Sequence, residues 1–86
     1  MKTPRKKKAV KVIRRKLRRE RAYGQAFTET KVVEIEERRK RKSSLRDLVH
    51  ELLHVAFPEK SERQIIKAER LIGDSLWDEN YRKVDQ

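Results

Sequence analysis

Apolar residues recur with two different periods along the chain, which predict strands in its first half and helices in its second. Valine and isoleucine alternate with charged residues in segments 9–17 and 31–36, as is typical of strands with one buried face. After residue 44 the apolar residues recur every three or four positions, as in amphipathic helices. We therefore expect strands at about 9–17, 23–27 and 31–36 and helices at about 44–56 and 61–77. This order predicts an α+β fold in which a small antiparallel sheet of about three strands packs against two helices.

The first strand has a competing interpretation, because Val10, Ile13 and Leu17 also fall at helical spacing. We favour a strand, since the run is rich in β-branched residues and lacks a residue suited to cap a helix. The next two strands are expected to form a hairpin around the polar connection 28–30, with Val33 and Ile35 on one face. Tyr23 and Phe27 are then expected on the facing strand.

Capping residues and proline set the expected helix boundaries. Ser43 or Ser44 is expected to open the first helix. With Ser44 as the cap, Asp47 falls at the third helical position in an arrangement similar to a capping box. Pro58 should end that helix just before it, because the residue preceding proline disfavours helical geometry. Ser61, with Gln64 three residues later, is expected to cap the second helix.

The first predicted helix contains both histidines of the chain, His50 and His54, with Glu51 directly after the first. This is the HExxH pattern. Residues four apart lie on one face of a helix, so both imidazoles can reach a single metal ion. Two imidazoles and a carboxylate are a common ligand set for catalytic zinc, which keeps its remaining position for water. The pattern therefore predicts a site for one zinc ion, with Glu51 as the general base for the attacking water.

The alternative is that both histidines are ordinary surface or half-buried residues of an amphipathic helix. The apolar residues of this helix argue against that interpretation, because they form a broad arc and leave the histidines on the opposite side. The arc consists of Leu45, Leu48, Val49, Leu52, Val55 and Ala56.

A third ligand is expected from the second helix. Two antiparallel helices joined near Pro58 place Glu62 opposite His54. Glu59 in the connection is a weaker candidate, and Glu69, about 10 Å further along the helix, could accept a hydrogen bond from a histidine instead. A different role open to Glu62 is that of a first-turn acid that complements the helix dipole.

The net charge of +11 is concentrated in the first half of the chain. Residues 1–22 carry twelve Lys/Arg against one acid, residues 23–42 six against four, and residues 43–86 seven against nine. Such a block indicates a polyanion partner, with nucleic acid the first candidate, although a solubilising face would carry the same charge. The candidate contacts are Lys6, Lys7, Lys8, Arg14, Arg15, Arg18 and Arg19.

Length and composition narrow the class of protein. Residues 1–8 are expected to be a disordered basic arm, and residues 9–86 a single small domain. With no cysteine the chain has neither disulfides nor a thiolate zinc site, which favours a reducing compartment. It has no apolar run long enough for a signal peptide or a membrane span, so we expect a cytoplasmic protein without membrane contact.

The motif and the residues that follow it resemble a known group of proteins. HELLH at 50–54, Ala56-Phe57-Pro58, Ser61-Glu62 and a helix ending in Leu76-Trp77 are similar to the small HExxH zinc metallopeptidases of phages and prokaryotes. These form a minimal zincin-like group, distantly similar to SprT-type proteases. The resemblance spans roughly residues 10–81 and implies zinc ligation by His50 and His54, with Glu51 activating water. The metzincin extension would require glycine and histidine at Phe57 and Lys60, which excludes that subclass.

The resemblance and the motif together imply a zinc metallopeptidase that acts on a peptide or protein substrate. Such an enzyme needs a donor for the developing oxyanion, and Tyr23, Tyr81 or a nearby arginine could supply it. The alternative is a basic nucleic-acid-binding module without enzymatic activity, whose metal site is idle or structural. A protease that acts near nucleic acid would combine both interpretations.

Overall fold

The computed structural model describes residues 10–17 and 23–84. In this part of the chain three strands are followed by two helices: β1 (Lys11–Arg15), β2 (Gly24–Phe27), β3 (Val32–Glu36), α1 (Arg41–Ala56) and α2 (Glu62–Asp78). Every predicted element is present, the strand interpretation of the first segment is correct, and the α+β class is confirmed. The basic arm expected at residues 1–8 lies outside the described residues.

The sheet is mixed, so the prediction of an antiparallel sheet was wrong in one of its two pairings. The strand order is β1-β3-β2. The hairpin forms as expected, with β2 antiparallel to β3 and Ala26 opposite Val33, whereas β1 pairs parallel with β3 and Val12 lies beside Val33. The cause is that β3 lies between β1 and β2, which run in opposite directions. Because β3 forms a hairpin with β2 and is antiparallel to it, β3 must run parallel to β1.

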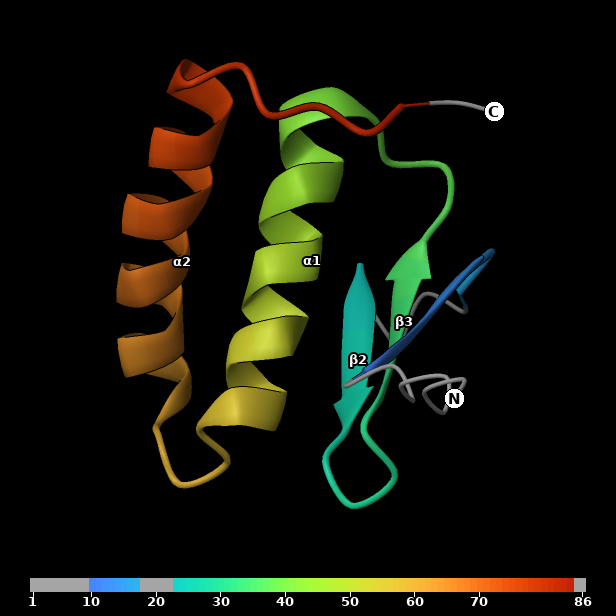
Figure 1. Ribbon diagram of the computed structural model, residues 1–86. Coiled ribbons are helices and arrows are strands. Elements are labelled where there is room, and N and C mark those ends of the chain that lie inside the picture. The colour runs from blue at the N-terminus through green and yellow to red at the C-terminus, as the bar shows by residue number, and fades with distance from the viewer. Residues whose placement is uncertain (1–9, 18–22, 85–86) are drawn as a thin grey trace, which may run out of the picture.

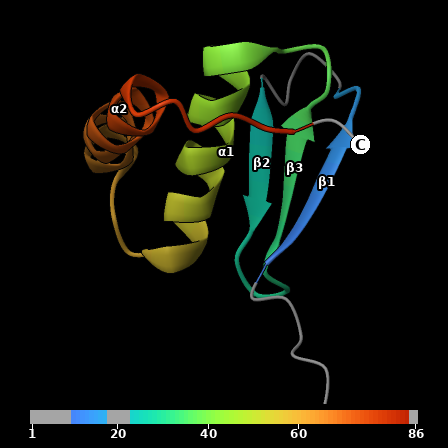
Figure 2. The ribbon, with the colours of Figure 1, turned by 45° about the horizontal axis from the view of Figure 1, so that its top comes forward.

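The elements form three layers, with α1 between the sheet and α2 (Figure 1). α1 packs on one face of the sheet through β2 and β3, and α2 packs against α1. The sheet therefore meets the helical pair through α1. Figure 2 shows the same stack turned, with β1 at the edge of the sheet farthest from α2. Neither of these helices is long and apolar enough to span a membrane.

Small residues on β2 allow α1 to come close to the sheet. Val33 and Ile35 are fully buried, and the residues directly opposite them are Ala26 and Gly24, which share their face of the sheet. Tyr23 and Phe27, which we had expected on the strand facing them, are 51% and 42% exposed. The core is completed by Leu17, Val49 and Ile65.

The start of α1 differs from the prediction. The helix begins at Arg41, and its N-cap residue makes no side-chain capping hydrogen bond. Ser44 lies inside the first turn, where its Oγ accepts a hydrogen bond of 3.0 Å from Arg14. Asp47 accepts hydrogen bonds of 3.1 and 3.2 Å from Arg39. The predicted capping box is therefore absent, because both of its side chains are engaged by arginines that precede the helix.

The end of α1 and the start of α2 agree with the prediction. α1 ends at Ala56, two residues before Pro58. Ser61 Oγ accepts a hydrogen bond from the Gln64 backbone N–H at 3.2 Å, and Gln64 Oε1 accepts one from the Ser61 N–H at 3.0 Å. This capping box fixes the first turn of α2, and with it the position of Glu62.

Glu36 ties the end of β1 to the end of β3. It is only 4% exposed, and its Oε1 accepts a hydrogen bond of 2.9 Å from the Leu17 backbone N–H. Arg38 donates to both carboxylate oxygens, at 2.6 and 2.7 Å. These bonds, that of Arg38 foremost, lower the pKa of the Glu36 carboxyl to about 2. The buried Glu36 carboxylate therefore belongs to a structural ion pair with Arg38 rather than to a functional site.

Candidate metal centre

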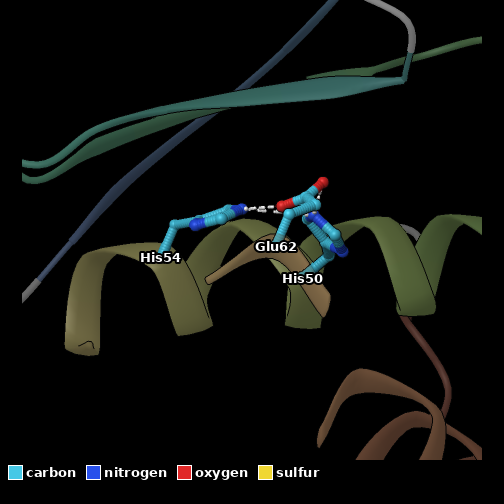
Figure 3. Close-up of side chains that lie close together, drawn as sticks. All are labelled: His50, His54 and Glu62. Atoms are coloured by element: carbon cyan, nitrogen blue, oxygen red, sulfur yellow. Dashed lines mark hydrogen bonds and ion pairs between the residues drawn. The ribbon is translucent and has the colours of Figure 1, made fainter. Parts of the chain in front are cut away.

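Two histidines of α1 and the first residue of α2 converge near the turn that joins the two helices. The Nε2 atoms of His50 and His54 lie 3.3 Å apart. Glu62 faces both, with Oε1 2.7 Å from His54 Nε2 and Oε2 3.1 Å from His50 Nε2. Figure 3 shows the carboxylate between the two rings. The three side chains together offer one ligand atom each, and these atoms all lie within 4.8 Å of one another.

The separation of the two imidazole nitrogens fits a tetrahedral zinc site. A tetrahedron with metal–nitrogen bonds of about 2.0–2.1 Å has edges of about 3.3–3.4 Å, and the two imidazole nitrogens are already separated by 3.3 Å. The Glu62 oxygens face one nitrogen each, at 2.7 and 3.1 Å, and are closer than such an edge, as expected for groups that hydrogen-bond to each other. Glu62 keeps a 62% exposed side chain, so it can move outward by this amount. The donor set of two imidazoles and one carboxylate is one that zinc accepts, with a fourth position free.

The other ring nitrogen of His50 faces α2. Its Nδ1 lies 3.2 Å from Glu69 Oε1, and the second oxygen of Glu69 accepts a hydrogen bond of 2.8 Å from Arg46 Nε. Glu69 is 9% exposed. The contact expected of Glu69 as a hydrogen-bond acceptor for a histidine is therefore present, and it leaves Nε2 as the nitrogen that points into the cluster.

Glu51 is buried between α1 and the sheet, with 8% of its surface exposed. Burial raises the pKa of its carboxyl, against the opposing effect of His50 and His54. A Cβ atom on Gly24 would lie 2.9 Å from Glu51 Cγ and 3.1 Å from its Oε2. The carboxyl group can occupy this position only because residue 24 has no side chain.

A cleft of about 460 Å³ opens beside the cluster. It runs between α1 and α2 and is bounded on the third side by Tyr23 and Gly24 at the start of β2. His50, Glu51 and Glu62 line one part of it. The other lining residues are Arg39, Ser43, Arg46, Asp47, Ile66, Glu69 and Arg70. Of the candidate oxyanion donors, Tyr23 and three arginines line the cleft, whereas Tyr81 is not among its lining residues and is 63% exposed.

Three of the remaining predicted residues, Glu59, Arg14 and Arg15, are described and lie outside the ligand group. Glu59 is exposed in the turn between the helices and does not belong to the ligand group. Of the candidate nucleic-acid contacts, Arg14 bonds to Ser44, and Arg15 pairs with Glu34 at 2.7 Å. The other five candidates, Lys6, Lys7, Lys8, Arg18 and Arg19, lie outside the described residues.

Sequence reasoning missed Gly24 and Arg46. A single glycine inside a strand pattern often marks a close approach of another group, and Gly24 carried that signal. Arg46 lies one turn before His50 on the same helix, but its partner Glu69 is 23 residues away, and no sequence spacing indicated the pairing.

Comparisons of the chain with protein-family models, with curated proteins and with solved structures find no match. The assignment of a function therefore rests on the geometry of the cluster and of the cleft beside it.

Proposed function

We propose that the protein is a zinc-dependent hydrolase that cleaves peptide bonds. The observation that carries this proposal is the convergence of His50, His54 and Glu62, whose ligand atoms all lie within 4.8 Å of one another. A buried carboxylate next to the first histidine and a cleft beside the cluster support a catalytic site rather than a closed structural one.

Zinc, when bound, would polarise the scissile carbonyl and lower the pKa of water so that hydroxide forms near neutral pH. Glu51 takes the proton from the attacking water as the C–O bond forms, and passes it to the amine as the C–N bond breaks. The close approach of Gly24 limits the Glu51 carboxyl group to a narrow range of positions. The same carboxyl group can therefore accept the proton from water and donate it to the amine without moving far. Tyr23 or an arginine of the cleft is the proposed donor to the developing oxyanion.

The substrate is proposed to be an extended segment of peptide or protein. β2 is at the edge of the sheet and hydrogen-bonds to β3 on one side only. Its start, at Gly24, lines the cleft. An extended chain laid along this edge would pair with the backbone of β2 and so bring a carbonyl group toward the cluster.

Three variants test the proposal with fluorescently labelled casein as substrate and with protein purified without a metal-affinity tag. Glu51→Gln should retain zinc and lose hydrolysis, because it keeps the ligands and removes the base. His54→Ala should lose both. Glu59→Gln, which changes an exposed acid outside the cluster, should lose neither. Zinc-loaded wild-type protein with no hydrolysis, or a fully active Glu51→Gln variant, would contradict the proposal.

A second candidate function is binding to nucleic acid, and the distribution of charge favours it. The described residues up to residue 42 include ten Lys/Arg and four acidic residues. Residues 43–84 include seven Lys/Arg and eight acidic residues. The positive charge of the described residues thus belongs to the sheet, its connections and the first turn of α1, where Lys42 alone of these cations is paired with an acid of α2, Asp74. Duplex DNA should bind with an affinity that falls steeply with salt and that is unaffected by chelators or by His54→Ala. Binding that changes little with salt would count against it.

A further inference from the structure

Arg46, Glu69 and His50 form a chain of contacts that crosses from α1 to α2 and back. Arg46 Nε donates to Glu69 Oε2 at 2.8 Å, and Glu69 Oε1 lies 3.2 Å from His50 Nδ1. Both oxygens of a nearly buried carboxylate are therefore occupied, one by the guanidinium and one by the imidazole. The far nitrogen of the same imidazole, Nε2, faces the metal cluster.

Gly73 gives Arg46 the room to make this contact. It lies one turn after Glu69 on α2 and is buried. A Cβ atom there would lie 3.0 Å from Arg46 Cγ and 3.8 Å from Arg46 Cα. Glycine is a poor helix former, so its presence inside α2 needs a reason, and the side chain of Arg46 supplies one. The absence of a side chain at residue 73 thus leaves room for the aliphatic part of Arg46 between the two helices.

A neighbouring ion pair shows what an ordinary contact between these helices looks like. Lys42, one turn before Arg46, pairs with Asp74 at 3.2 Å, with side chains 42% and 46% exposed. Arg46 and Glu69 have side chains 35% and 11% exposed. After loss of the first pair Asp74 can turn to water, because its side chain is 46% exposed although its Oδ1 is buried. Loss of the second leaves one oxygen of a nearly buried carboxylate without its partner. Glu69 would then turn toward solvent or toward another donor.

We propose that Arg46 is a positioning residue for the metal centre, acting through Glu69 on His50. The guanidinium holds the rotamer of Glu69, and Glu69 holds the ring of His50 through its Nδ1. A carboxylate paired with arginine accepts hydrogen bonds and does not donate them, so Glu69 favours the Nδ1–H tautomer, whose Nε2 lone pair is free for a metal ion. Glu62, 3.1 Å from Nε2, opposes this preference only while no metal ion is bound. The effect on metal binding rests on the function proposed above, while the effect on His50 does not.

The first test measures zinc affinity by competition with a chromophoric chelator. Arg46→Met keeps the aliphatic stem next to Gly73 and removes the guanidinium, and it should weaken zinc binding about tenfold, the lower end of the range for loss of an outer hydrogen-bond partner. Arg46→Lys keeps a cation and should recover part of the affinity. Lys42→Met, the matched control, removes the neighbouring interhelical pair and should leave zinc affinity unchanged. Equal affinity in Arg46→Met and wild type, or equal losses in Arg46→Met and Lys42→Met, would overturn the proposal.

The second test needs no metal. It uses a Glu62→Ala background, which removes the carboxylate that faces His50 Nε2 at 3.1 Å. Two-dimensional ¹H–¹⁵N spectra of imidazole nitrogens at about pH 8.5, where imidazoles are in general neutral, report which nitrogen of His50 carries the proton. In this background the parent and Lys42→Met should show the Nδ1–H form, and Arg46→Met a mixture of tautomers. The same Nδ1–H form in all three would overturn the proposal. A change in the tautomer of His50 in this background, together with a wild-type protein that binds no zinc, would uphold the positioning role while refuting the proposed hydrolase.

Gly73→Ala provides an independent check. In wild type it should weaken zinc binding, because the new methyl group displaces Arg46. In an Arg46→Ala background, which lacks the Cγ atom that would clash, it should have no further effect. Equal losses in both backgrounds would show that Gly73 acts on the centre by another route and would overturn its assigned role.

Discussion

Replacement of Gly24 by alanine should separate the function of Glu51 from that of the metal ligands. The added Cβ would lie 2.9 Å from Glu51 Cγ and 3.1 Å from Oε2, so the buried carboxyl group has to move. Because Gly24 does not contact the ligand cluster, zinc content should stay at the wild-type level. Hydrolysis should fall by a factor of about 10–100, part of the contribution of about 10²–10⁴ that a positioned general base makes.

The stability cost follows from two opposing effects. Overpacking of a tight site costs about 1–3 kcal/mol, while alanine for glycine at a compatible backbone position stabilises by about 0.4–1 kcal/mol through the unfolded chain. Gly24 does not have a positive φ, so the second effect applies. We expect a net loss of about 1–2 kcal/mol in the free energy of unfolding.

A double-mutant cycle assigns this loss to Glu51. Urea denaturation in the presence of a chelator, so that metal binding does not contribute, should give a coupling of about 1–3 kcal/mol between Gly24→Ala and Glu51→Ala, because the gain through the unfolded chain is common to both backgrounds and cancels. The second close contact of residue 24, the Glu34 carbonyl oxygen at 3.1 Å, is the same in both backgrounds and cancels. An equal cost of Gly24→Ala with and without the Glu51 side chain would refute the reasoning.

Three further predictions concern stability. The pKa of the Glu36 carboxyl is lowered from 4.5 to about 2, so its stabilising effect is complete above about pH 4.5 and is lost as the pH falls toward 2. Urea denaturation at several pH values should therefore show a flatter decline in Glu36→Gln than in wild type, and parallel curves would contradict it. Ser61→Ala should cost about 1 kcal/mol and Ser61→Thr much less, with equal losses pointing away from the cap. Zinc at about one hundred times its Kd should raise the free energy of unfolding by about 2.7 kcal/mol, and should have no effect on His54→Ala.

Local sequence rules predicted most of the elements because the chemistry that sets them is local. The Ser61–Gln64 capping box and Pro58 bound the turn between the helices, and the turn alone brings Glu62 opposite His54. The β-branched alternation around Val33 likewise identifies a strand whatever its neighbours are. The geometry of the candidate ligand group could thus be anticipated from the spacing within residues 50–62.

Contacts between distant segments could not be predicted in the same way. The parallel pairing of β1 depends on β3 entering between β1 and β2, which no turn signal specifies. α1 begins before the predicted cap at Ser44, and the side chains of Ser44 and Asp47 accept hydrogen bonds from Arg14 and Arg39 instead of capping the helix. Each of these outcomes depends on side chains that meet only after the layers have packed.

The most direct test of the account is the zinc content of the purified protein, measured by elemental analysis after exhaustive dialysis. The account predicts one zinc ion per chain in wild type, and none in variants that lack either His50 or His54. Wild-type protein without zinc, or a full zinc content in a variant that lacks His50 or His54, would contradict it.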